Sequence, residues 1–482
     1  MLEGLDSSKF FEYFEEICSI PRGSGNNTGI SNYLVTFAKE HHLNYRQDAF
    51  ENVIIWKPAS KGAENQPAVM LQGHMDMVCE KEENCAHDFT KQGLELVVQD
   101  DKIFAKGTTL GGDDGIALAY MLAILDDEQL SHPPIEAVFT TDEETGMEGA
   151  IGLDTSDLKS KYFINLDSEE EGCMLTSCAG GMTVNGTFSL KREKKEGYVV
   201  SIGVDGLQGG HSGAEIDKNR ENAVLLLGRV LTELLNAGVK FQLVTMSGGL
   251  KDNAIPRNAN AKIMVSRVED VKENVQSVFQ MLRKELVNRE EDVVFSVECS
   301  ALETAEAIEG DLTEKILFFL EQVPNGIQKM SSAIPGLVES SLNLGICTCT
   351  ESEFFTSFSI RSSVQSYKDY MGMKMKHLIE NLGAVFEMKS QYPAWEYRVD
   401  SKLRNLMVPI YEAQYGEKPR IEAIHAGLEC GILAQKMPEL DMVSIGPDIL
   451  DIHTPKETLI ISSAKRVYQF VIAVLEQLSK EK

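Results

Sequence analysis

Metal-binding side chains in this sequence come directly after short, apolar, strand-like runs. Histidine, aspartate and glutamate bind divalent cations through nitrogen and oxygen. Four runs are followed by such side chains, and a glycine-rich loop carries further acids. The segments and their side chains are 68–73 with His74, 135–140 with Glu143 and Glu144, 162–166 with Asp167, 442–445 with His453, and 111–115 with Asp113.

Together these side chains form a ligand set suited to two metal ions. Imidazole and carboxylate ligands favour zinc, with manganese or cobalt as substitutes. Two ions roughly 3.5–4 Å apart that share a bridging carboxylate can hold an attacking water and a substrate carbonyl oxygen. The spacing of His74 and Asp76 lets the aspartate accept the imidazole N–H that the metal does not use. Of the adjacent Glu143 and Glu144, one can bind metal while the other acts as the general base.

Each of these residues also has a structural interpretation when it is taken alone. An aspartate before a helix, such as Asp113, often caps the helix N-terminus. A single histidine or a run of acids is more often structural or solvated than catalytic. Cys347 and Cys349 form an isolated C-x-C motif on an apolar run. They could bind a metal, but buried thiols are the commoner interpretation. The metal interpretation therefore depends on all five segments meeting at one place.

The runs that precede the candidate ligands are expected to be strands of one sheet. Early in the chain, strand-like runs alternate with helical patterns, including a helix over 115–125, which favours parallel pairing in a sheet covered on both faces. Ligands bind just beyond the carboxyl ends of parallel strands, where the following loops converge. The sequence therefore predicts an α/β catalytic domain with a mixed, mainly parallel sheet flanked by helices.

The pattern of the sequence changes near Met182 and changes back after Trp395. Between these points, alternating β runs with glycine-rich turns are punctuated by helices, which predicts an inserted α+β lid domain. A chain of 482 residues is long enough for more than one core. We expect a catalytic domain from 1–184 and 395–482, and a lid over 185–394 that could hold two similar halves.

The overall charge argues against several classes of partner. A formal charge of −28 repels nucleic acid and anionic membrane surfaces. The start of the chain has neither a basic nor an apolar stretch, and no run reaches the ~18 apolar residues that span a bilayer. The nine cysteines are odd in number and scattered, which argues against a disulfide framework. We therefore expect a cytoplasmic protein.

The order of these motifs resembles the co-catalytic zinc peptidases, a family that includes carboxypeptidase G, peptidase T, succinyl-diaminopimelate desuccinylase and carnosinase-like dipeptidases. The likeness is strongest to its dipeptidases that cleave Xaa-His peptides, through 71–80, 425–431 and 451–457. One departure is Gly115, where many relatives have a lysine. The motifs, which span nearly the whole chain, are Gly-His-Met-Asp at 73–76, Gly-Asp-Asp-Gly at 112–115, Asp-Glu-Glu-Thr-Gly at 142–146, Asn-Leu-Asp at 165–167 and Ile-His-Thr at 452–454.

The resemblance implies a role for each residue of the site. Glu143 would take the proton of a metal-activated water and pass it to the leaving amine, and Asp76 would orient a histidine ligand. The cofactor would be two zinc ions per chain. Their ligands would be His74 and Asp167 for one ion, His453 and Glu144 for the other, and Asp113 as the bridge between them.

The resemblance also implies substrate contacts in the inserted domain. His211, within Gly-Gly-His-Ser-Gly, resembles the lid histidine that helps to stabilise the oxyanion, and Asn253 and Arg361 resemble lid residues that contact the substrate. Asn253 could instead shape a turn. Arg361 lies on an apolar run, where a buried charge needs a partner, either the substrate carboxylate or an internal acid. The resemblance places His425 and Glu429 in the catalytic-domain part of the cleft without assigning them roles.

Asp167 bears on the substrate, because in similar enzymes this position is aspartate when the substrate has a free amino terminus and glutamate when the amine is acylated. We expect a metal-dependent dipeptidase for free-amine dipeptides, with Xaa-His and carnosine-like peptides preferred. One alternative is an N-acyl-amino-acid amidohydrolase with the same metals, and another is a metal- or peptide-binding protein without catalysis. The sequence leaves open a homodimer through the lid, and whether His211 acts within its own chain.

Overall fold

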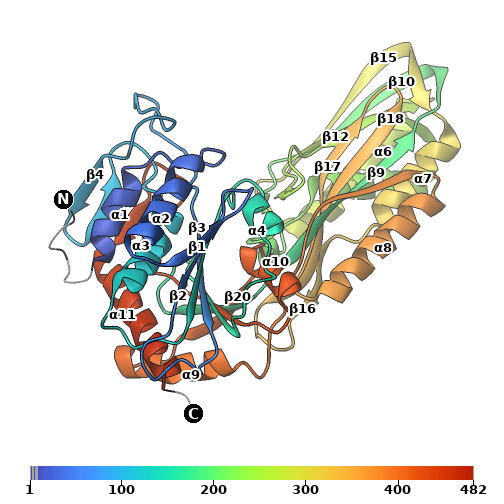
Figure 1. The fold of residues 1–482 in the computed structure, drawn as a ribbon. Coiled ribbons are helices and arrows are strands. Elements are labelled where there is room, and N and C mark those ends of the chain that lie inside the picture. The colour runs from blue at the N-terminus through green and yellow to red at the C-terminus, as the bar shows by residue number, and fades with distance from the viewer. Residues whose placement is uncertain (1, 3–4, 6–8, 481–482) are drawn as a thin grey trace. The chain divides into compact units, whose positions relative to one another are not determined.

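The computed structural model describes residues 2, 5 and 9–480 of the chain (Figure 1). Residues 1, 3–4, 6–8 and 481–482, which belong to the predicted catalytic segments, lie outside the described residues. The chain divides into two compact units. Unit 1 comprises Met1–Ser177, Tyr397–Ala423 and Leu428–Lys482, and unit 2 comprises Cys178–Glu396 and Ile424–Gly427.

Unit 1 is built on a mixed sheet whose central strands are parallel. The predicted apolar runs form β3 (Val69–His74), β6 (Ile135–Thr140), β7 (Tyr162–Asn165) and β21 (Asp441–Ser444), all of them buried. Parallel pairing joins β3 to β6 and β7, and β7 to β21. Burial on both faces explains why these strands are rich in apolar residues without a polar alternation. With β1 (Asn44–Gln47), β2 (Val53–Lys57), β8 (Cys173–Cys178) and β20 (Arg420–Ile424), the order is β1-β2-β6-β3-β7-β21-β8-β20.

Helices cover both faces of this sheet. Helix α3 (Gly112–Asp126) is buried from Gly112 to Leu125, which explains a sequence that is apolar on every side. Figure 1 shows α1 (Phe10–Cys18), α2 (Thr28–Glu40), α3 and α11 (Ile461–Leu478) on one side of the sheet, and α4 (Glu148–Gly152) and α10 (Glu429–Lys436) on the other. Helix α9 (Lys402–Tyr415) adds Leu403 and Met407 to the same core. A small sheet has the order β22-β23-β5-β4, formed by Ile449–Leu450, Thr458–Ile460, Lys102–Ala105 and Leu96–Gln99.

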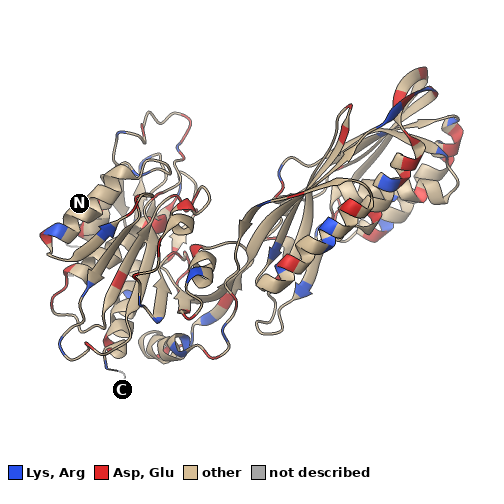
Figure 2. Ribbon diagram, turned by 45° about the vertical axis from the view of Figure 1, so that its right-hand side comes forward, with Lys and Arg blue, Asp and Glu red and all other residues tan. Residues whose placement is uncertain are grey.

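Unit 2 is an antiparallel sheet packed against helices, with a core of its own. Helices α5 (Ala223–Asn236), α6 (Val268–Leu286), α7 (Gly310–Gln322) and α8 (Gln365–Asn381) bury apolar residues in that core. Figure 2 shows charged residues of both signs along the helices of this unit. Outside the main sheet, β11 (Gly210–His211) pairs with β13 (Ala254–Ile255). The main sheet has the order β15-β10-β14-β12-β17-β18-β9-β19 with β16 beside β17, formed in that order by Val294–Ile308, Arg192–Asp205, Ala259–Val265, Phe241–Gly248, Val338–Cys349, Glu353–Ser362, Gly180–Ser189, Val385–Tyr392 and Gly326–Met330.

The predicted fold class is confirmed, with a mixed α/β sheet flanked by helices and an inserted α+β unit. The chain enters unit 2 at Cys178, before the predicted boundary of 184/185, because β9 begins at Gly180 and pairs with β18. The segment 424–427 also belongs to unit 2, where the Ala179 N–H donates to the Ile424 carbonyl at 3.1 Å. Two similar halves within unit 2 stay a prediction. None of the described helices has the length and apolar character to cross a membrane.

Candidate metal centre

Strands β3, β6 and β7 bring their following residues to the same edge of the unit 1 sheet. The three strands run parallel, and His74 is aligned with Thr140 in the pairing of β3 and β6. His74 ends β3, the acids of 142–144 follow β6, and Asp167 comes two residues after β7. Because the carboxyl ends of parallel strands lie at one edge, these side chains can share one site.

Asp113 lies between two imidazoles. Its Oδ1 is 3.0 Å from His74 Nε2, and its Oδ2 is 3.1 Å from His453 Nε2. The loop turns into this position at Gly111, whose φ of 62° lies in the left-handed region that favours glycine. The peptide bond between Asp113 and Asp114 is cis. The Asp113 carboxylate faces the two imidazoles and accepts none of the backbone N–H groups of α3 among the described residues, so the helix-cap interpretation of Asp113 does not hold.

Each imidazole has a second carboxylate in addition to the shared Asp113. His453 Nε2 is 3.1 Å from Glu144 Oε1, and His74 Nε2 is 3.5 Å from Asp167 Oδ1. His74, Asp113 and Glu144 offer ligand atoms that all lie within 4.8 Å of one another. The structure therefore brings together the five predicted ligands, in the pairing that the motifs imply.

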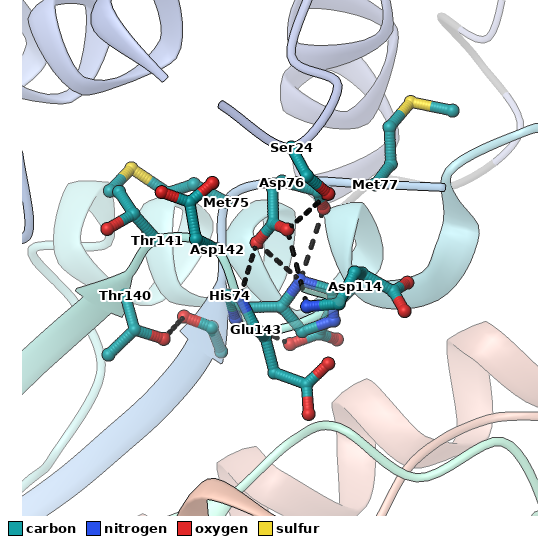
Figure 3. Close-up of polar contacts among 12 residues, drawn as sticks. Ser24, His74, Met75, Asp76, Met77, Asp114, Thr140, Thr141, Asp142 and Glu143 are labelled. Carbon is teal, nitrogen blue, oxygen red and sulfur yellow. Dashed lines mark hydrogen bonds and ion pairs between the residues drawn. The ribbon is translucent and has the colours of Figure 1, made fainter. Parts of the chain in front are cut away.

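Asp76 holds His74 through the ring nitrogen that faces away from Asp113. Its Oδ1 is 3.3 Å from His74 Nδ1, and Ser24 Oγ donates to its Oδ2 at 2.8 Å. Figure 3 shows Asp76 between Ser24 and the imidazole. The Asp76 carboxylate also accepts the backbone N–H groups of Glu143 and Glu144, at 3.1 and 3.4 Å. Asp76 thus fixes the loop after β6 and leaves His74 Nε2 directed at the other carboxylates.

The Glu143 side chain is partly buried, and none of the described residues donates a hydrogen bond to its carboxylate. Burial raises the pKa of Glu143 well above its usual value, reinforced by the negative charges of Asp167, Glu429 and Glu144 and opposed by His74. A partly buried carboxyl group whose oxygens have no internal donor is free to accept a proton and to return it. Glu143 therefore has the properties of a general base.

The charges at this site fit bound cations. Burial raises the pKa of Asp167 to about 6, reinforced by Asp113 and Glu144 and opposed by His74. Hydrogen bonds to Asp113 and Glu144 raise the pKa of His453 to about 10. Both shifts show that the crowded carboxylates favour a positive charge among them. Neutral imidazoles with three carboxylates are a donor set for divalent metals, so the residues fit the metal ions that the sequence predicts.

Asp114, Arg22 and Glu457 lie at the site but are absent from the sequence prediction. Asp114 is buried, and its Oδ2 accepts the backbone N–H of His74 at 3.1 Å. It forms a second possible ligand group with His74 and Asp167. The paired acids of the 112–115 motif were a usable signal for Asp114. Arg22 donates to the Gly111 carbonyl and Glu457 accepts the backbone N–H of Asp113, and contacts of this kind between distant segments leave no local signal in the sequence.

Glu429 is the first residue of α10 and is fully buried in unit 1. Its Oε2 accepts hydrogen bonds from Thr140 Oγ1 at 2.6 Å and Gln72 Nε2 at 2.5 Å, while its Oε1 has no partner among the described residues. Asn165 Nδ2 donates to Gln72 Oε1 at 2.7 Å, which extends the row of polar contacts across β6, β3 and β7. Burial raises the pKa of Glu429 to about 8. Glu429 therefore links β6, through Thr140, to β3, through Gln72, which lies two residues before His74.

Three of the residues predicted to contact substrate meet around Gly213 in unit 2. A Cβ added to Gly213 would lie 3.0 Å from the His211 ring, 3.1 Å from Arg361 Nε and 2.8 Å from the His425 carbonyl oxygen. His211 Nδ1 accepts the N–H groups of Gly213 and Ala214 at 3.2 and 2.9 Å, which leaves Nε2 to carry the ring proton. Burial and the charge of Arg361 lower the pKa of His211. His211 is therefore a neutral donor.

Arg361 and His425 each keep a buried nitrogen without a partner among the described residues. Arg361 Nη1 donates to the Tyr392 hydroxyl at 3.1 Å, but its Nε has no acceptor. His425 Nε2 is 2.7 Å from Ser341 Oγ, and its Nδ1 is unpaired. Burial, reinforced by Arg361 and His211, lowers the pKa of His425 to about 3. No described acid pairs with Arg361, so this cluster has the capacity to bind an anion.

Asn253 lies in unit 2 as the sequence predicts, whereas His425 lies in a different unit from the predicted one. The Asn253 side chain is exposed and its backbone carbonyl accepts the Ser212 N–H at 2.9 Å, which fits the turn-shaping interpretation. His425 belongs to unit 2 and not to the catalytic domain, because the segment 424–427 is bonded to the start of that unit. The Cys347 thiol is fully buried and lies in none of the possible metal groups of the described residues.

Comparisons with known proteins cover almost the whole chain. The profile of peptidase family M20/M25/M40 matches residues 70–477. The cytosol non-specific dipeptidase of Escherichia coli (strain K12) is 36% identical over 481 residues, with 99% of each chain covered. The crystal structure of aminoacylhistidine dipeptidase from Vibrio alginolyticus is similar with a TM-score of 0.94 at 36% identity, over 99% of this chain and 98% of that one. Aminopeptidase PepT from Bacillus cereus ATCC 10987 shares the fold, with a TM-score of 0.57 at 15% identity over 98% of each chain.

Proposed function

The chain belongs to peptidase family M20/M25/M40, and from this premise we propose that it hydrolyses dipeptides with a free amino terminus by means of two zinc ions. Two proteins that match it over almost their whole length are named as dipeptidases, one from Escherichia coli and one from Vibrio alginolyticus. These names support a peptide substrate over an acylated amino acid. The metal ligands and the base are part of the proposal.

The observation that carries the proposal is the position of Asp113 between His74 and His453. A carboxylate whose two oxygens face two imidazoles can bridge two metal ions. Asp167 would complete the site of His74, and Glu144 that of His453. When bound, the metals would polarise the peptide carbonyl and lower the pKa of a water from about 15.7 towards 7.

Glu143 would move the proton in this reaction. No residue in the described part of the chain donates a hydrogen bond to its carboxylate, and its backbone N–H donates to Asp76 Oδ1 at 3.1 Å. It would take a proton from the attacking water and then give it to the nitrogen of the leaving amine. Asp76 would keep the proton of His74 on Nδ1, so that the lone pair of Nε2 faces the metal.

The cluster of His211, Arg361 and His425 in unit 2 would bind the C-terminal carboxylate of the dipeptide. A buried guanidinium without an acidic partner is costly, and a substrate carboxylate would supply that partner. The neutral His211 would stabilise the negative charge of the oxyanion by donating a hydrogen bond from Nε2. A substrate contact by Asn253 stays a prediction.

The two named relatives differ in the substrate range that their names describe, because one is a non-specific dipeptidase and the other an aminoacylhistidine dipeptidase. We propose a dipeptidase that accepts Xaa-His peptides among others. A cytoplasmic location is part of the proposal, since the Escherichia coli relative is named a cytosol enzyme. A homodimer through unit 2 stays a prediction.

Metal stripping and reconstitution test the proposed function. Protein freed of metal with a chelator would receive Zn²⁺, Co²⁺ or Mn²⁺, and its rates on Ala-His, β-Ala-His and Ala-Leu would be compared with those on the N-acetylated peptides. We expect two zinc ions per chain and hydrolysis of the free-amine dipeptides only. Preference for the acetylated forms would support the amidohydrolase alternative, and a metal-loaded protein that cleaves neither class would refute catalysis.

A further inference from the structure

We propose that Arg22 and Glu457 are positioning residues that hold the loop of Asp113 in the geometry that binds metal ions. The inference rests on the proposed metal site and adds residues that determine its affinity. Both side chains are almost fully buried in unit 1, with exposed fractions of 1% for Arg22 and 2% for Glu457. Both act on the loop through its backbone.

Glu457 accepts hydrogen bonds from four successive backbone N–H groups. Its Oε2 accepts those of Leu110 and Gly111 at 2.8 and 3.0 Å, and its Oε1 accepts those of Gly112 and Asp113 at 2.8 and 3.2 Å. These groups lie at the start of α3, where the first N–H groups have no partner within the helix. A carboxylate can accept all four because each of its oxygens has two lone pairs. Glu457 therefore fixes the backbone up to Asp113 itself.

Arg22 binds the same loop through a carbonyl oxygen. Its Nη1 donates to the carbonyls of Met75 and Asp76 at 2.9 and 3.0 Å, and its Nη2 donates to the carbonyl of Gly111. The guanidinium thus joins the turn after His74 to the loop of Asp113. A planar fork of donors suits this task, whereas the single nitrogen of lysine could not keep the same directions.

Together the two side chains join the segments that must present Asp113 to both imidazoles. Arg22 connects 74–76 with 111, and Glu457 connects 453–457 with 110–113. Asp113 lies 3.0 Å from one histidine and 3.1 Å from the other, so a shift of its loop toward either one would lengthen the opposite distance. Residues that orient ligands in this way typically change metal affinity when they are lost.

The glycines of this loop leave the space that the guanidinium fills. A Cβ at Gly111 or Gly115 would lie 2.5 Å from Arg22 Nη2, and one at Gly115 would also lie 3.3 Å from the Phe14 ring. Gly115 is the position where the sequence departs from the lysine of many relatives. Any side chain at Gly115 would therefore have to displace Arg22.

The affinity of the intact protein for Zn²⁺, measured by competition with a chromophoric chelator, tests this proposal. Glu457→Gln leaves one oxygen as an acceptor and turns an amide NH₂ toward the other pair of N–H groups. We expect its Zn²⁺ dissociation constant to rise about 10- to 100-fold, with KM unchanged and kcat near the wild-type value at saturating zinc. Arg22→Lys and Gly115→Ala should change affinity in the same direction, because both loosen the Gly111 carbonyl.

Glu136→Gln is the matched control. Glu136 is a buried carboxylate of the same unit that accepts the N–H groups of Lys159 and Ser160, at 2.9 and 3.0 Å, and it lies at the opposite end of β6 from the candidate ligands. This variant should lose thermal stability as Glu457→Gln does but keep wild-type zinc affinity. Wild-type affinity in Glu457→Gln, Arg22→Lys and Gly115→Ala, or an equal loss in Glu136→Gln, would overturn the proposal.

Hydrogen exchange of the wild-type protein tests the same proposal without any variant. If Glu457 holds the loop in advance of metal binding, the amides of 110–113 should be protected in the metal-free protein. Fast exchange there would contradict the inference even if every variant failed to fold. A wild-type protein that binds no zinc and cleaves no dipeptide would instead refute the proposed function, so the two failures can be told apart.

Discussion

At Glu143, proton transfer can be separated from metal binding. Glu143→Gln keeps the shape of the side chain and the backbone N–H that Asp76 accepts, but the amide cannot take a proton. We expect kcat to fall by about 10²–10⁴ while zinc content stays at the wild-type level. Dipeptide hydrolysis and bound metal would be measured on the same sample. Glu148→Gln, an exposed glutamate in the first turn of α4, is the control, and near-normal turnover of a zinc-loaded Glu143→Gln would remove the base assignment.

His425 makes the stability of unit 2 depend on pH. Burial lowers its pKa to about 3, against about 6.5 for a free histidine. The unfolded chain therefore binds more protons between these values, so the free energy of unfolding contributed by His425 is present above about pH 6.5 and is lost as the pH falls towards 3. Over this pH range the contribution of His425 to the free energy of unfolding changes by about 5 kcal/mol at most.

Thermal unfolding between pH 7.5 and 4 would check this dependence on His425. We expect His425→Gln to lose less stability than the wild type on acidification, because the buried group that resists protonation is gone. His377→Gln, which changes an exposed histidine of α8, should keep the wild-type slope. Identical slopes for all three proteins would show that His425 does not control the acid sensitivity.

The elements that carry the candidate ligands could be predicted because their signals are local. The run 135–140 coincides with β6, since a strand buried on both faces needs apolar residues throughout. The predicted helix at 115–125 lies within α3, which begins at Gly112 because the chain turns at Gly111. Parallel pairing of such strands then places His74, Glu144 and Asp167 at one edge, as the sequence implies.

Contacts between distant segments could not be predicted in the same way. Glu457 stands in a polar segment like any solvated glutamate, and only the folded chain shows that it binds the N–H groups of 110–113. Arg22 gives no sequence signal for its three carbonyl partners. His425 is assigned to the catalytic domain by sequence because a four-residue return into unit 2, at 424–427, leaves no change of composition.

Metal removal should loosen particular loops of unit 1. The segments 142–146 and 451–454 carry the candidate ligands Glu144 and His453, which lie close to each other and to Asp113. Bound zinc would therefore hold both segments in place. By mass action, zinc at about 1,000 times its dissociation constant would stabilise the folded state by about 4 kcal/mol. Hydrogen exchange with and without chelator should show faster exchange in these loops and no change in β9 and β18 of unit 2. Equal changes in both units would contradict a metal site confined to unit 1.

The proposed metal chemistry and the proposed substrate contacts fall in different units of the chain. The candidate metal ligands and Glu143 belong to unit 1, whereas His211 and Arg361 belong to unit 2. Each unit has its own apolar core. The chain enters and leaves unit 2 at neighbouring points, because Cys178 and Trp395 exchange backbone hydrogen bonds at 3.0 and 3.1 Å. The insertion can therefore be removed without stretching the rest of the chain.

A protein in which a short Gly-Ser linker replaces 179–394 tests this division of roles. We expect it to bind zinc within a few-fold of the wild-type affinity, because every candidate ligand remains. Its turnover of dipeptides should fall by more than about 10²–10³, the typical effect of losing one oxyanion donor, since His211 and Arg361 are both absent. Circular dichroism would verify the fold, and chelator competition and peptide hydrolysis would give the two readouts. Turnover close to the wild type would mean that unit 2 does not bind the substrate, and loss of zinc binding from a folded protein would mean that unit 1 does not hold the metals alone.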